Sequence, residues 1–318
     1  YYTGDAAAPK PGATLLTGVT DDDPQDRVLA HPLPTTLREV ERALSGVLLR
    51  EEIYAADDPP QTAVPYSVQH QRYLVRLLKP SRHPSEPAAL MPRLLESVTC
   101  RYERQKDDPL CRHQINLRWD RYGALEHSIA IDHARRTIAT DAPPFSEANE
   151  QQWWRDAHDP AQQSWYLNET CTQWIHLDAT ERWRLQLPYR QRSNVLVLAK
   201  DALRADQIAY EYFTERHAAH PLGPSAQRQL AGLSVHHYCQ ADCSETLAPG
   251  TASFQALTAY LEVAELDEPA LAAYQHLPTL SLTTLGYRPM RMFLPEDSVQ
   301  PSAQTLWSLT REHVRYDQ

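Results

Sequence analysis

Hydrophobic and polar residues alternate most regularly between residues 97 and 131. Three runs in this stretch, SVTCRYERQ, HQINLRW and ALEHSIAI, place every second side chain on one face, as a half-buried β-strand does. Turn-forming segments, KDDPL and DRYG, separate the runs. The regular spacing predicts an antiparallel meander of three strands. The residues expected on its buried face are Val98, Cys100, Tyr102, Ile115, Leu117, Trp119, Leu125, Ile129 and Ile131, with His127 among them.

The second turn of this meander has a defined chemistry. Trp119 ends one strand, Asp120 opens the turn, Gly123 closes it, and Leu125 starts the next strand. Aspartate tolerates turn geometry, and glycine accepts a positive φ at no steric cost. We therefore expect Trp119, Asp120, Gly123 and Leu125 to form a structural turn that folds the ribbon back on itself.

The N-terminal 36 residues are rich in Asp, Pro, Gly and Thr and have little periodicity, which predicts an irregular lead-in. A helix is expected next, capped by Thr36 and ended by Gly46, with Leu37, Val40 and Leu44 on one face. No Gly/Ser linker and no block of like charge interrupts residues 37–318. We therefore expect these residues to form part of one β-rich region.

The remaining segments give patterns of unequal clarity. Strands are predicted within 46–55, 64–79, 229–240 and 306–318, each bounded by turn residues or partly alternating. Residues 137–175 are mixed and fit a short helix or a long loop, and 182–199 fit two strands on either side of a loop. Residues 201–215 have helical spacing near their start and can end as a strand, whereas 256–276 suggest a helix pair, followed by a strand within 279–294.

Composition narrows the function classes. Lys plus Arg number 31 against 41 Asp plus Glu, a net charge of −10, which argues against a nucleic-acid partner. Only 9 glycines are present, which argues against phosphate-cradling loops. No apolar run is long enough for a membrane-spanning helix, and the first residues lack the pattern of a secretory signal. The chain begins at Tyr1 rather than Met, so we expect it to be a fragment of a longer protein.

Cysteine and histidine residues give one candidate metal cluster. The sequence HHYCQADC contains His236, His237, Cys239 and Cys243, but adjacent histidines on a strand point to opposite faces and cannot share one ion. A second segment, ERHAAH (215–220), lacks the H-E-x-x-H order of a metalloprotease helix. We therefore predict no metal site.

Other chemistry-bearing residues have simpler interpretations. The five cysteines are an odd number spread over the chain, which fits synthesis in a reducing cytoplasm, and Cys100 is interpreted as a small core residue across a hairpin from Cys111. No nucleophile-elbow, dinucleotide or Walker motif is present. Trp153 and Trp154 are able to stack sugars, but buried packing is the expected role. The sequence therefore predicts a protein without catalytic residues or cofactors.

Several stretches resemble a known family. NLRWDRYGALEHS is similar to the YD repeat of Rhs-type proteins, with Trp119 where that repeat usually has Tyr, followed by Asp120, Gly123 and Leu125. The terminal VRYDQ resembles the start of another copy. In sequence order, RALSGVLLREEIYA, AVPYSVQHQRYLVRLL, the meander of 97–131 and WRLQLPYRQRSNVLVL resemble the region after the propeller in the B component of bacterial insecticidal Tc toxin complexes.

The resemblance implies a mainly β fold, made of antiparallel hairpins of a curled Rhs/YD-type sheet with a few short helices. It also implies a structural, non-enzymatic role. In such complexes the B component and the Rhs-repeat part of the C component form a hollow shell around a toxic segment, and a propeller docks the shell onto the A-component pore. The implied location is secretion from the bacterial cytoplasm as part of the toxin complex. This architecture is physically reasonable, because each hairpin can form hydrogen bonds with the unpaired backbone groups at the edge of the next, and the paired hairpins build a wall.

Two other functions compete with this one. The chain could be part of an Rhs shell from another toxin delivery system, which the sequence upstream of this segment would distinguish. It could also be a carbohydrate-binding or glycan-cleaving β protein, which would need exposed tryptophans along a groove and, for cleavage, two suitably spaced carboxylates.

Overall fold

The computed structural model describes residues 2–18, 26–56, 63–81, 83, 86–179, 181–214, 220–223, 226–266, 268–274, 277, 281–291 and 305–311. The strands are β1 (Leu15–Gly18), β2 (Arg27–Val28), β3 (Arg50–Ile53), β4 (Ser67–Lys79), β5 (Ala89–Arg101), β6 (Leu110–Trp119), β7 (Leu125–Asp132), β8 (Ser164–Ala179), β9 (Arg182–Ala199), β10 (Gln229–Tyr238), β11 (Thr258–Leu266), β12 (Arg288–Arg291) and β13 (Thr305–Arg311). The helices are α1 (Pro34–Ala43), α2 (Ala148–Asp156), α3 (Tyr210–Thr214) and α4 (Glu268–Ala273), with short 3-10 turns η2 (Pro160–Gln163) and η3 (Ala205–Gln207). The protein is therefore mainly β with a few short helices, as the sequence predicts.

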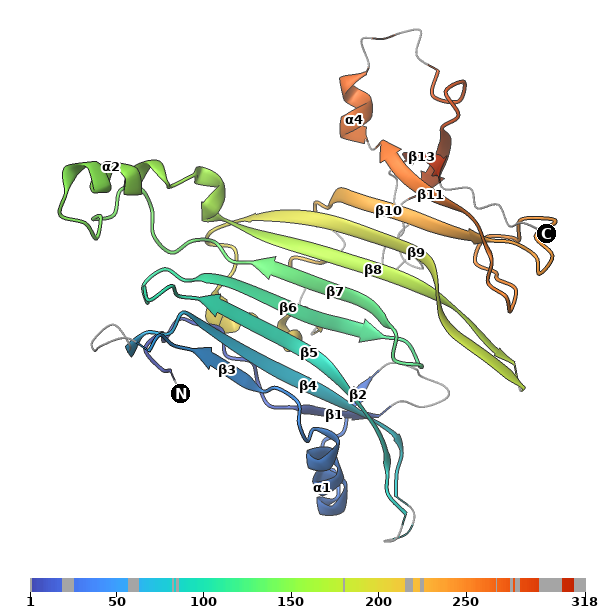
Figure 1. Ribbon diagram of the computed structural model, residues 1–318, viewed down its shortest axis with the longest axis horizontal. Coiled ribbons are helices and arrows are strands. Elements are labelled where there is room, and N and C mark those ends of the chain that lie inside the picture. Colours follow the sequence, from blue (N-terminus) through green and yellow to red (C-terminus); the bar gives the residue numbers. More distant parts are fainter. Residues whose placement is uncertain are drawn as a thin grey trace. The chain divides into compact units, whose positions relative to one another are not determined.

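The described strands form one open, mixed sheet (Figure 1). Its order is β12-β13-β11-β10-β9-β8-β7-β6-β5-β4-β1-β2, and β3 also pairs with β4. From β4 to β10, neighbours in the sheet are consecutive in the sequence, which is the order that hairpins generate. The parallel pair of β1 and β4 is the exception among the registers of the described strands.

The three-strand meander is confirmed. β5, β6 and β7 lie next to one another in the sheet, and Cys100 stands directly opposite Cys111 in the register of β5 and β6. The side chains expected on the buried face are buried, except that Leu125 and His127 are partly exposed. Strict alternation gives a reliable prediction for β6, where one face packs against a core and the other does not, whereas Ser128 to Ile131 of β7 are all buried.

Several predictions outside the meander are wrong. Residues 137–175 contain the short helix α2, which is one of the two predicted possibilities, but they end in a strand, because β8 starts at Ser164. Residues 182–199 form the single strand β9 without an internal loop. Residues 201–215 contain η3 and α3 but no strand in their described part. The first half of the predicted helix pair is β11, since pairing with β10 and β13 overrides the helical propensity of its Ala, Leu and Glu residues.

The N-terminal segment also differs from expectation. Part of the predicted irregular lead-in forms β1, which pairs in parallel with β4, a partner too distant in sequence to leave a local signal. Helix α1 forms as predicted, but Leu33 rather than Thr36 is its N-cap, and Pro34 occupies its first turn. Gly46 follows the helix with a φ of +85°, the left-handed conformation that a terminating glycine adopts.

The chain divides into two compact units. Unit 1 comprises Tyr1–Gly123, Ser128–Asn168 and Leu196–Ala226, and unit 2 comprises Ala124–His127, Glu169–Val195 and Gln227–Gln318. The predicted boundary at residue 36 has no test here and stays a prediction.

The core of unit 1 lies between its strands and the segment that follows β9. Helix α3 packs against β6, and α1 packs against β5. The largest buried cluster consists of Ile115, Leu117, Ile129, Ile131, Trp165, Leu167, Leu196, Leu203, Ile208, Phe213 and Leu222. These residues come from four strands and from 203–222, so the segment after β9 covers one face of the sheet portion in this unit.

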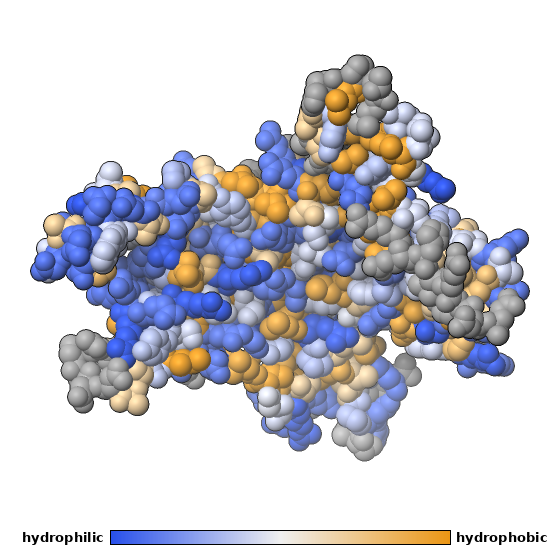
Figure 2. Space-filling model, turned by 45° about the horizontal axis from the view of Figure 1, so that its top comes forward, coloured by the Kyte–Doolittle hydropathy of each residue, from blue (hydrophilic) through white to orange (hydrophobic). Residues whose placement is uncertain are grey.

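The core of unit 2 is smaller. Cys171, Leu233 and Leu306, from β8, β10 and β13, form its buried cluster, and Leu230, Ala264 and Met290 pack against it. On the face drawn in Figure 2, hydrophobic residues occur in small groups between hydrophilic ones, an ordinary distribution for a protein surface. Among the described residues, none of the helices combines the length and the apolar character that crossing a membrane requires.

Candidate functional site

The turn between β6 and β7 lies where the sequence predicts it. Trp119 ends β6 and is buried, and the Asp120 carboxylate accepts a hydrogen bond from the Tyr122 N–H at 2.8 Å. The Gly123 N–H donates to the Asp120 carbonyl at 3.1 Å, and Gly123 has a φ of +78°. Leu125 starts β7 within unit 2, where its carbonyl accepts a hydrogen bond from Trp174 Nε1 at 2.9 Å. All four residues therefore contribute to the turn or its flanking strands, whereas their identity as a YD repeat stays a prediction.

A buried arginine donates a hydrogen bond to the backbone of this turn. Arg76 of β4 donates from Nη1 to the Asp120 carbonyl at 2.6 Å. Its Nε and Nη2 donate to the two carboxylate oxygens of Asp26 at 2.9 and 2.5 Å, and Thr17 Oγ1 also donates to Asp26 at 2.7 Å. The Arg76 side chain is fully buried. One guanidinium thus connects the turn, β1 and β4 within unit 1.

Replacing Gly123 by alanine is expected to lower the free energy of unfolding by about 2–3 kcal/mol, because a left-handed alanine is strained and its Cβ must displace packed side chains. A Cβ at Gly123 would lie 2.1 Å from Arg93 Nη2 and 2.7 Å from Met91 Sδ. Urea unfolding would measure the change. Gly46→Ala is the matched control, since Gly46 also has a positive φ but has no atom within 4 Å of such a Cβ. A smaller loss for Gly123→Ala than for Gly46→Ala would contradict the prediction.

Unit 1 contains a buried carboxylate that is fully engaged. Glu96 Oε1 accepts hydrogen bonds from Arg72 Nη1 at 2.6 Å and from the Tyr210 N–H at 3.1 Å, and Glu96 Oε2 lies 3.0 Å from His113 Nε2. Arg72, opposite Glu96 in the register of β4 and β5, also forms a two-point ion pair with Glu211 of α3. The network therefore joins strands β4, β5 and β6 to the helix that covers them.

Burial alone would raise the pKa of Glu96, but its partners reverse the effect. His113, Arg72 and the Tyr210 N–H hold the pKa of Glu96 below its ordinary value. The Glu96 carboxylate consequently stays ionised at neutral pH and has no proton to donate. A structural role fits this state better than general acid catalysis does.

Unit 2 contains a second buried carboxylate. Glu169 of β8 accepts hydrogen bonds from Arg228 Nε at 2.7 Å and Asn194 Nδ2 at 3.0 Å. His127 Nε2 lies 3.1 Å from Glu169 Oε1, and Arg192 Nη2 lies 3.7 Å from Glu169 Oε2. Burial would raise the pKa of Glu169, but His127 and Arg228 hold that pKa far below its ordinary value.

The Glu169 network includes a geometric candidate for a metal site. The ligand atoms of His127, Glu169 and Cys171 all lie within 4.8 Å of one another. However, Arg228 and Arg192 direct their guanidinium groups at Glu169, and Arg192 Nη2 donates to Cys171 Sγ at 3.2 Å. These two cations already neutralise the carboxylate and would repel a metal ion. The residues therefore fit an arginine-compensated core better than a metal centre, and the expectation that the chain binds no metal stays a prediction.

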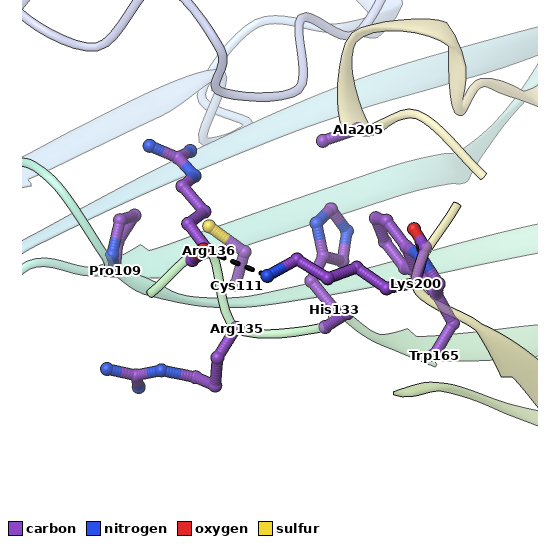
Figure 3. A pocket seen from close by; sticks show the side chains of 9 residues that line it. Pro109, Cys111, His133, Arg135, Arg136, Trp165, Lys200 and Ala205 are labelled. Atoms are coloured by element: carbon purple, nitrogen blue, oxygen red, sulfur yellow. Dashed lines mark hydrogen bonds between the residues drawn. The ribbon is translucent and has the colours of Figure 1, made fainter. Parts of the chain in front are cut away.

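A small cavity of about 120 Å³ lies in unit 1 (Figure 3). The cationic groups at its wall already have partners: Arg136 pairs with Asp5 at 2.9 Å, Arg135 with Asp108 at 2.8 Å, and Lys200 Nζ donates to the Arg136 carbonyl at 2.9 Å. Carboxylates therefore compensate the charges of both arginines, whereas the Lys200 ammonium is held by a neutral carbonyl oxygen. Its lining residues are Pro109, Cys111, His133, Ala134, Arg135, Arg136, Trp165, Lys200 and Ala205.

His133 predicts a pH dependence. Burial, with the nearby charges of His113 and Arg136, lowers the pKa of His133 to about 3. In the unfolded chain the His133 imidazole takes up a proton near pH 6.5, whereas in the folded chain it does not. The free energy of unfolding therefore decreases as the pH falls below 6.5, by at most about 1.4 kcal/mol per pH unit. Urea unfolding of His133→Phe, whose ring can keep the contact with Trp165, is expected to show a shallower loss between pH 6.5 and 4 than the parent. An equal loss in both would contradict this, and the exposed His31→Ala serves as the control.

The other predicted candidates do not form a site among the described residues. His237 is buried beside Glu262, with 3.1 Å between His237 Nε2 and Glu262 Oε2, while His236 on the same strand is not buried. Of the segment 215–220, only His220 lies within the described residues. Trp153 is 66% exposed, so the expectation that it packs in a core is wrong, because α2 has no buried residue.

Sequence reasoning missed both buried carboxylates. Glu169 stands in phase with the buried residues Trp165, Leu167 and Cys171, and Glu96 stands in phase with Val98 and Cys100. An acidic residue at a core position of an alternating run is a detectable signal, since such a group is buried only with a partner. The partners themselves leave no local signal.

Comparisons with known proteins agree with this fold. The family model described as "Insecticide toxin TcdB middle/C-terminal region" matches residues 39–187. The crystal structure of TcdB2–TccC3 matches 99% of this chain with a TM-score of 0.86 at 24% identity, and the Photorhabdus luminescens Tc holotoxin pore matches 99% with a TM-score of 0.85 at 24% identity. The chain spans 15% and 14% of the lengths of those two chains. No curated protein matches the sequence.

Proposed function

We propose that this chain, which is Tc toxin B-component-like, forms part of the wall of a hollow β-shell. The shell encloses a toxic polypeptide and helps to deliver it to target cells. Its partners in this role are a C component that completes the shell, the enclosed toxin segment, and an A-component pore reached through a propeller elsewhere in the B component. The complex acts outside the bacterium that produces it.

The observation that carries the proposal is the long, mostly antiparallel sheet, which has the fold of a segment within TcdB2–TccC3. Consecutive hairpins add strands to such a sheet one pair at a time, so the wall can extend in both directions. The arginine-held turn after β6 and the networks of Glu96 and Glu169 stiffen the hairpins in each unit.

The same networks support a non-enzymatic role. Among the described carboxylates, Glu96 and Glu169 are fully buried, and each is kept ionised by cationic or hydrogen-bonding partners. General acid catalysis would need a carboxyl group whose pKa is raised towards neutrality, which is the opposite condition. We therefore propose that this region works as a scaffold.

The proposal is tested with the full-length parent chain, co-expressed with the C-component protein encoded beside it and purified through a tag on the parent alone. We expect the two proteins to co-purify as hollow particles in negative-stain images. We also expect the C-terminal segment of the C component to resist added protease until the particle is denatured. The C component expressed alone is the control, and its segment should be cleaved. Separate purification, or a segment cleaved equally in both samples, would overturn the proposal.

A further inference from the structure

Two cysteines face each other across the first hairpin of the meander. Cys100 of β5 and Cys111 of β6 are direct partners in the strand register, and their sulfur atoms lie 2.7 Å apart. Both side chains are buried. An S–S bond is about 2.0 Å long, so a small movement of either side chain would allow the bond to form.

The backbone position of this pair also suits a disulfide. The Cys111 carbonyl accepts a hydrogen bond from the His133 N–H at 3.1 Å, so it points away from β5. The N–H of Tyr102 donates to the Tyr66 carbonyl at 2.7 Å, on the side of β5 away from β6. Residues two apart in a strand direct their backbone N–H and C=O groups to the same side, so those of Cys100 also point away from β6. The cysteines therefore occupy a non-hydrogen-bonded site, where opposite Cα atoms are about 4.5 Å apart, within the range that disulfides span.

We propose that Cys100 and Cys111 are a modification site that forms an intrachain disulfide when the protein meets an oxidising low-molecular-weight disulfide such as oxidised glutathione. The Cys111 sulfur attacks the small disulfide, which releases one thiol and leaves a mixed disulfide on Cys111. The Cys100 sulfur then attacks Cys111, the S–S bond forms between them, and the second small thiol leaves. The two protein thiols are oxidised, each loses its proton, and one small disulfide is reduced to two thiols.

The cavity in unit 1 gives the order of these steps. Cys111 lines it, with its sulfur beside Arg136, whereas Cys100 is not among its lining residues (Figure 3). The first exchange therefore takes place at Cys111, and Cys100 resolves it from inside the core. Contact with Cys100 and burial raise the pKa of the Cys111 thiol, so the exchange is slower than at an ordinary exposed thiol.

Peptide mapping of the full-length parent chain tests the site. The protein is incubated with oxidised glutathione, remaining thiols are blocked with iodoacetamide, and trypsin is added without reductant. Cleavage after Arg and Lys places Cys100 in the peptide 94–101 and Cys111 in the peptide 107–112. We expect these two peptides to appear joined by one S–S bond, and dithiothreitol to separate them. Cys239 and Cys243 share a single longer peptide, so a bond between them cannot imitate this product.

Two cysteine-to-serine variants distinguish the proposed disulfide from oxidation of exposed cysteines elsewhere. In Cys100→Ser, glutathione should remain attached to Cys111, and in Cys111→Ser neither peptide should be crosslinked. Oxidation of the parent should raise the temperature at which this region melts, because the bond closes a loop in the unfolded chain, and Cys100→Ser should show no rise. Peptides 94–101 and 107–112 that stay separate and fully alkylated after a day in oxidised glutathione would overturn the proposal, as would glutathione that persists on Cys111 in the parent.

Discussion

Glu169→Ala is expected to lower the free energy of unfolding by about 3–5 kcal/mol, the cost of breaking a buried ion pair by removing one partner. The substitution leaves the buried Arg192 and Arg228 without the carboxylate that compensates their charge. It also removes the acceptor of Asn194 Nδ2. Urea unfolding at pH 7, followed by circular dichroism, would measure the loss.

Two further variants define what this loss means. Glu181→Ala changes an exposed carboxylate between β8 and β9, where surface substitutions alter stability by about 0.5 kcal/mol or less. Glu169→Gln keeps the shape and an acceptor oxygen but removes the charge, so we expect a loss between those of the two alanine variants. A loss below about 1 kcal/mol for Glu169→Ala would show that Arg192 and Arg228 do not depend on this carboxylate.

The parts of the fold that the sequence predicts are those with a local cause. The alternation at the end of β5 and along β6 follows from one buried face, and Asp120 and Gly123 carry the chemistry of the turn within four residues. β8 was not predicted because Glu169 occupies one of its core positions, and polarity there conceals the alternation. The loop predicted within 182–199 is absent, although the described pairing of β9 with β10 begins only at Arg190.

The candidate site was beyond the reach of sequence reasoning for a different reason. Glu96 and Arg72 are 24 residues apart, and Arg72 and Glu211 are 139 residues apart. No helical or strand periodicity relates positions at such separations, because their meeting depends on the register of the sheet and on where α3 lies over it. The cysteine pair falls between these cases, since a hairpin brings Cys100 and Cys111 together, but only the register shows that they are direct partners.

Arg76→Met is expected to lower the free energy of unfolding by about 3–5 kcal/mol. As at Glu169, the substitution breaks a buried ion pair, but here the cation is removed and a carboxylate is left. Methionine keeps much of the side-chain volume, but it leaves the nearly buried Asp26 without its ion-pair partner and the Asp120 carbonyl without the Arg76 donor. Arg101→Met, which replaces an exposed arginine at the end of β5, should change stability by about 0.5 kcal/mol or less.

A double-mutant cycle shows whether the ion pair itself is responsible. Because replacing both charges of a buried pair by apolar groups is often neutral or stabilising, Arg76→Met combined with Asp26→Leu should be more stable than Arg76→Met alone. The double variant should still be less stable than the parent, since the Asp120 carbonyl at the turn remains without the Arg76 donor. Strictly additive losses in the two single variants would show that Arg76 stabilises the fold mainly by holding the turn, with little contribution from Asp26.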